Sequence, residues 1–144
     1  MSERENQSNW ILVLIRGLAI AAAINCVIVP MLFAQQRPLF PLPGLYMIEI
    51  GVLGILGLTG LLLIETFSPF WRAVPWIAAG ALLAFVILGG FSIGFYLIPA
   101  TSAFLLAGSL LNRLEKGPVS KYIGLFLITA ILQATLMIIL VQIA

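Results

Sequence analysis

Three polar side chains inside apolar stretches are the residues of this sequence best placed to do chemistry. Glu49, Asn25 and Gln133 each interrupt a separate apolar run. At 1.5 Å of rise per helical residue, counting from the expected ends of those runs places all three at a similar depth. Ionisable groups inside a membrane are costly and by default mark function. The three therefore form a candidate polar site for an ion, a proton or a polar head group.

The same residues also have a structural interpretation. Glu49 could rise to the outer headgroups or pair with Arg37, while Asn25 and Gln133 hydrogen-bond neighbouring helices and hold them together. In the functional interpretation, Glu49 is instead a carboxyl that takes up and releases a proton or cation. The sequence leaves both interpretations open.

Arg16 is a cation within the first apolar run. It is a candidate for contact with an anion or lipid, because a long Arg side chain can reach phosphates at the membrane surface. It could equally reach Glu65 at the end of the second run.

Glycines recur every third residue through the second run. A step of three residues falls about 60° short of a full turn, so the four glycines spread over roughly half of the helix circumference. This favours close packing against more than one neighbouring helix over a single dimer seam. The predicted helix-packing residues are Gly51, Gly54, Gly57 and Gly60.

Several kinds of chemistry lack the residues they need. The chain has no His and no Asp, and its single cysteine is Cys26, so the usual zinc, copper, haem and iron–sulfur ligand sets are missing. No metal and no cofactor is expected. The serines at membrane depth have no His or Lys to act as a base, so an enzyme is the least supported class.

Composition indicates the elements that must hold these residues. Hydrophobic residues make up 62% of the 144-residue chain and charged residues 8%, against about 45–50% and 25% in soluble domains. The sequence therefore predicts an all-α integral membrane protein, with residues 1–144 forming one polytopic domain. Because about 20 apolar residues cross a bilayer, we expect a compact bundle of five transmembrane helices at about 10–34, 44–66, 73–89, 94–111 and 121–142.

The third and fourth predicted helices come from one long uncharged stretch. It is too long for one span, and its glycines between Gly89 and Gly94 favour a turn. Each half is short for a span, so the pair forms either a tight transmembrane hairpin or a re-entrant one that returns to the same side.

Basic residues predict the orientation. With five crossings, one side holds Arg4, Arg16, Arg72, Arg113, Lys116 and Lys121, and the other holds Arg37. The positive-inside rule then places the N-terminus in the cytoplasm and the C-terminus outside, in a multi-pass plasma (inner) membrane protein.

Two functions are compatible with these residues. The first is a small membrane protein that acts by helix packing, as an accessory subunit of a membrane complex or as a self-associating scaffold. Its partners would be the lipid bilayer and other membrane subunits or further copies, and the net charge of +2 is too small to suggest nucleic acid. The second is a small transporter or ion- or proton-conducting protein that uses the intramembrane Glu49.

Overall fold

The computed structural model describes residues 2–35, 42–63, 70–90, 92–115 and 118–143. Within these residues the chain is helical, which confirms the prediction of five helices in an all-α protein. Each of the five has a stretch long and apolar enough to cross a membrane, judged by length and composition. The helices are α1 (Ser2–Ala34), α2 (Leu42–Leu62), α3 (Phe70–Leu88), α4 (Ile93–Glu115) and α5 (Val119–Ile143).

All five helices begin before the predicted residue: α1 at Ser2 and not near residue 10, α2 at Leu42 and not at 44, α3 at Phe70 and not at 73, α4 at Ile93 and not at 94, and α5 at Val119 and not at 121. α4 also continues to Glu115 and not only to 111, whereas α2 ends at Leu62, before the predicted 66. Polar residues can continue a helix that an apolar run has started, because the backbone hydrogen bonds do not depend on burial. Pro75 lies inside α3 and does not end it. A proline removes only one backbone donor, and the remaining backbone hydrogen bonds continue the helix.

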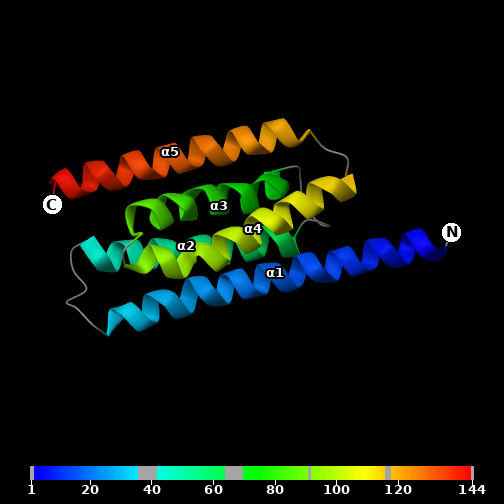
Figure 1. The fold of residues 1–144 in the computed structure, drawn as a ribbon, viewed down its shortest axis with the longest axis horizontal. Coiled ribbons are helices and arrows are strands. Elements are labelled where there is room, and N and C mark those ends of the chain that lie inside the picture. Colours follow the sequence, from blue (N-terminus) through cyan, green and yellow to red (C-terminus); the bar gives the residue numbers. More distant parts are fainter. Residues whose placement is uncertain (1, 36–41, 64–69, 91, 116–117, 144) are drawn as a thin grey trace.

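The first four helices form a closed ring. α1 packs against α2 and α4, and α3 packs against the same two helices. Neighbours in the ring run antiparallel, as expected for consecutive helices with short connections (Figure 1). α5 lies outside the ring, where its main neighbour is α3. The chain is therefore a four-helix ring with one peripheral helix.

Apolar side chains fill the inside of the ring. The largest of the fully buried side chains come from all four ring helices: Phe85, Phe104, Ile15, Ile50, Leu82 and Leu97. Tight filling of this kind is what dispersion forces between membrane helices require, because lipid chains are as apolar as the side chains they would replace. The interior of the ring is therefore a packed core.

Three glycines of α2 lie where other helices come closest. A Cβ added at Gly54 would lie 2.5 Å from Cys26 Cβ of α1, and one at Gly57 would lie 2.5 Å from the Phe104 ring of α4. One at Gly60 would lie 2.7 Å from Val74 Cβ of α3. The glycines thus face three different helices.

A tight turn joins α3 to α4. The Gly89 carbonyl accepts hydrogen bonds from the backbone N–H groups of Ser92 and Gly94, both at 2.8 Å. A Cβ added at Gly94 would lie 2.7 Å from the Gly89 oxygen. The two helices therefore fold back on each other at these glycines, and each is of spanning length by itself.

Candidate functional site

One stripe of residues attaches α5 to the rest of the molecule. The Tyr122 ring stacks on Trp76 of α3 with 6.0 Å between ring centroids. Further along α5, the backbone of Phe126 approaches α3 so closely at Gly80 that an added Cβ would collide with the Phe126 carbonyl. Among the described side chains of α5, those that are buried are Gln133 and Met137. They are four residues apart and so lie on one face of the helix.

The two buried residues of α5 connect it to α2. The Gln133 side-chain amide donates a hydrogen bond of 2.6 Å to Glu49 Oε1. One turn further along α5, the Tyr46 hydroxyl donates a weaker bond of 3.4 Å to the backbone carbonyl of Met137. The α2–α5 pair is not among the closely packed helix pairs of the fold. These polar contacts therefore link two helices that have little other contact.

The second carboxylate oxygen of Glu49 has a different environment. Glu49 Oε2 is buried and has no hydrogen-bond partner among the described residues. A buried charged oxygen without a partner is costly, and a proton or a cation bound at this oxygen would neutralise its charge. One carboxylate oxygen of Glu49 is thus bonded to Gln133, and the other could bind a proton or a cation.

Tyr46 is a member of this group that sequence reasoning missed. It lies three residues before Glu49, which places both on one face of α2. Its ring also makes an edge-to-face contact with Phe85, with centroids 5.8 Å apart. The spacing of three residues was the available signal. An aromatic residue at an expected membrane boundary is otherwise interpreted as an interfacial anchor alone.

Asn25 lies apart from the Glu49–Gln133 pair. Because Cys26 of α1 meets Gly54 of α2, counting along the antiparallel helices puts Asn25 about 9 Å from the level of Glu49. Asn25 is also turned about 100° from Cys26, on the side away from Ala23, which also borders Gly54. Its Oδ1 is buried without a hydrogen-bond partner among the described residues. The structure therefore brings together two of the three candidate site residues.

Arg16 has an exposed side chain on α1. The contacts of Gly54 with Cys26 and of Gly60 with Val74 show which residues of α1, α2 and α3 lie at the same level along the bundle. Arg16 then falls at the level where α3 begins, an expected position for a cation that contacts headgroups or anions. Two partners suggested by the sequence, Glu65 for Arg16 and Arg37 for Glu49, lie outside the described residues.

The fourth glycine of the series differs from the other three. A Cβ added at Gly51 would have no atom within 4 Å, so no neighbouring helix approaches α2 at this position. A substitution at Gly51 is therefore a control for the same substitution at Gly54, Gly57 or Gly60.

The other polar groups of the described residues lie apart from the Glu49 group. In the described part of the chain, no group of three or more His, Cys, Asp or Glu residues could hold a metal ion. Cys26 is a buried free thiol against α2. The Thr129 hydroxyl, one turn before Gln133, donates to the Leu125 carbonyl of its own helix at 2.8 Å. Thr129 is thus not part of the Glu49 group.

Comparison with known proteins adds no assignment. The chain matches no protein-family model, no curated protein and no solved structure.

Proposed function

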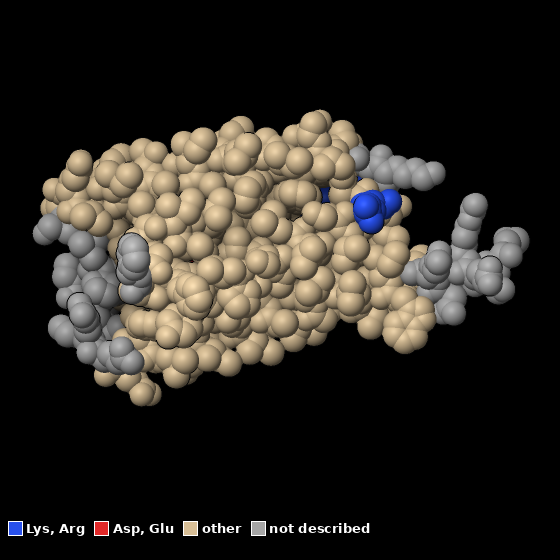
Figure 2. Space-filling model, viewed as in Figure 1, with Lys and Arg blue, Asp and Glu red and all other residues tan. Residues whose placement is uncertain are grey.

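We propose that this chain is a multi-pass membrane protein that acts by helix packing, as an accessory subunit of a membrane complex or as a self-associating scaffold. The N-terminus would lie in the cytoplasm and the C-terminus outside, in the plasma (inner) membrane. Figure 2 supports this orientation. On the face that it shows, the visible Lys and Arg lie at the end where α1 begins, away from the broad uncharged surface, and the positive-inside rule places such an end in the cytoplasm.

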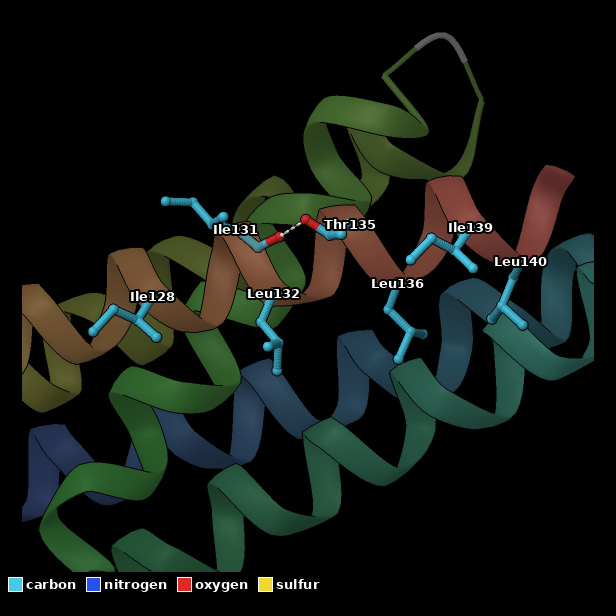
Figure 3. A pocket seen from close by; sticks show the side chains of 7 residues that line it. All are labelled: Ile128, Ile131, Leu132, Thr135, Leu136, Ile139 and Leu140. Carbon is cyan, nitrogen blue, oxygen red and sulfur yellow. Dashed lines mark hydrogen bonds between the residues drawn. The ribbon is translucent and has the colours of Figure 1, made fainter.

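An apolar groove along α5 carries the packing proposal. It has a volume of about 590 Å³ and is lined by residues of α5 alone. The lining residues form two neighbouring rows, each at intervals of four residues: Ile128, Leu132, Leu136 and Leu140 in one row, and Ile131, Thr135 and Ile139 in the other (Figure 3). Helices pack by inserting the ridge of one into such a groove of another. The groove is therefore suited to a further membrane helix.

The packed interior supports the same proposal. The ring core is filled by buried apolar side chains. The ring is therefore a rigid support that holds α5 in place when a partner packs against it. The close glycine contacts of α2 lie within the chain and are already used for its own fold. Association with other chains would therefore use the outer surface of α5.

Blocking the groove tests the proposal. Thr135 lies in the groove, and its hydroxyl donates to the Ile131 carbonyl of the same helix at 2.8 Å. Thr135→Trp should fill the groove and abolish co-purification of differently tagged copies, or of stoichiometric membrane partners. Ile55→Trp, on an exposed position of α2, is the matched control and should leave assembly unchanged. A wild-type protein that is monomeric and partner-free in mild detergent would reject the packing proposal.

The unpartnered oxygen of Glu49 supports a second candidate function. A buried carboxylate with one oxygen lacking a partner among the described residues, held by Gln133 of a peripheral helix, suits a small transporter or an ion- or proton-conducting protein. In liposomes, a proton or cation flux that Glu49→Gln abolishes would support this candidate. Equal flux in wild type and Glu49→Gln would reject Glu49 as the conducting group.

A further inference from the structure

A second cavity lies at the base of α5, on the side of α3. It has a volume of about 440 Å³ and is lined by the first residues of α3 and by successive turns of α5. Ser120 and Lys121 line it in the first turn of α5, and Leu125 and Ile128 line it further along. Phe70 and Ala73 of α3 line it as well. The cavity is thus amphipathic along its length.

Packing behind the cavity holds its wall in place. Tyr122 stacks on Trp76 with an angle of 22° between the rings. Trp76 also packs closely against α4, because a Cβ added at Gly108 would lie 2.8 Å from the indole nitrogen. Gly124 contributes open space, since a Cβ added there would meet no atom within 4 Å. The wall of the cavity is therefore held by packing, and Gly124 is the position where a larger side chain can be introduced.

We propose that this cavity binds one anionic phospholipid, with its phosphate at Lys121 and Ser120 and an acyl chain along Leu125 and Ile128. Among the described residues that line it, one is a cation and none is acidic, so the lining complements a headgroup of net negative charge better than a zwitterionic one. Juxtamembrane Lys and Arg residues recognise anionic lipids in this way.

The dimensions agree with a lipid. Lys121 and Ile128 are seven residues apart, which is about 10 Å along a helix, within the roughly 15 Å that one leaflet contributes to the hydrocarbon core. Ile128 lines both this cavity and the groove on α5, so the acyl chain would end where the groove begins. The inference rests on the proposed membrane location and is independent of the accessory role.

Native mass spectrometry of the full chain in detergent tests the site. Phosphatidylglycerol and phosphatidylcholine with identical acyl chains are the two probes. Wild type should retain one phosphatidylglycerol with about fivefold preference, the factor expected for one Lys near an anionic headgroup. Lys121→Gln should remove the preference, and Gly124→Leu should fill the cavity and remove the bound lipid.

Matched variants separate this site from general effects. Arg113→Gln removes an exposed cation of α4, and Gly17→Leu fills open space at a glycine of α1; both should behave as wild type. Equal retention of the two lipids by wild type would overturn the proposal. So would an equal loss in Arg113→Gln and Lys121→Gln, or a retained lipid in Gly124→Leu. A protein chain bound in the cavity in place of lipid would also overturn it. Absence of the protein from the membrane fraction would instead reject the membrane location itself.

Discussion

One methyl group added at Gly54 should separate α1 from α2. The added Cβ would lie 2.5 Å from Cys26 Cβ, whereas ordinary contact begins at 3.4 Å, so the gap must widen by 3.4 − 2.5 = 0.9 Å. Cys26 Cβ is bonded directly to the α1 backbone, so no side-chain rotation can relieve the contact. The helices themselves must move apart, and the buried contacts beside Gly54 loosen with them.

The expected cost follows from two opposing terms. Overpacking of a well-packed core costs about 1–3 kcal/mol, and we take about 2–3 kcal/mol because a backbone must move. Alanine is favoured over glycine in a helix by about 1 kcal/mol. Gly54→Ala should therefore lower the free energy of unfolding by about 1–2 kcal/mol. Gly51→Ala, which meets no atom within 4 Å, keeps only the favourable term and should be neutral or stabilising by up to about 1 kcal/mol.

Unfolding in mixed micelles, followed by tryptophan fluorescence, measures the difference. A double variant identifies its cause. Cys26→Gly combined with Gly54→Ala removes the opposing Cβ and should recover much of the loss, whereas Cys26→Ala with Gly54→Ala keeps that Cβ and should not. Equal stability of Gly51→Ala and Gly54→Ala would refute the reasoning, and so would equal rescue by the two Cys26 substitutions.

Three further predictions concern α5 and the orientation. Gly80→Leu would collide with the Phe126 backbone and should release α5 from α3, seen as increased proteolysis or hydrogen exchange confined to α5; uniform protection would contradict it. Gln133→Leu leaves Glu49 without its partner and should lower the free energy of unfolding by about 1 kcal/mol. Glu49→Gln keeps a hydrogen-bonding pair and should lower it by less. A larger loss of stability in Glu49→Gln than in Gln133→Leu would argue against the pair as a structural link. Cysteines introduced at Ser8 and Gln142 should react with impermeant reagents from opposite sides of the membrane, and labelling from one side would exclude five crossings.

The number of helices could be predicted because it depends on local properties. An apolar run of about 20 residues has one stable arrangement in lipid, with all backbone groups bonded within the run, and each of the five runs supplies a helix. The fold-back at Gly89 and Gly94 was visible for the same reason, since a glycine-rich turn depends on neighbours in sequence. Helix ends were less predictable, because polar residues such as those before Glu115 continue a helix without any apolar signal.

The site was only partly predictable, because depth alone does not determine which helices are neighbours. Counting residues brought Glu49, Asn25 and Gln133 to one level, but the alignment of α1 with α2 puts Asn25 about 9 Å from the level of Glu49. The rotation of α1 also turns Asn25 away from α2, whereas the rotation of α5 turns Gln133 toward Glu49. Helix rotation depends on the fit of small and large side chains across interfaces, here Gly54 with Cys26 and Gly80 with Phe126. A single sequence carries no record of that fit.

The sequence by itself determined an all-helical chain of five apolar helices and the concentration of basic residues toward one end, because hydropathy and charge act residue by residue. Only the tertiary structure decided that four helices close into a ring and that α5 remains outside it. It also decided that three glycines of α2 meet three different helices while Gly51 meets none, and that Glu49 bonds to Gln133. These features arise from contacts between residues far apart in the chain, where close packing selects one arrangement among many that hydropathy allows equally.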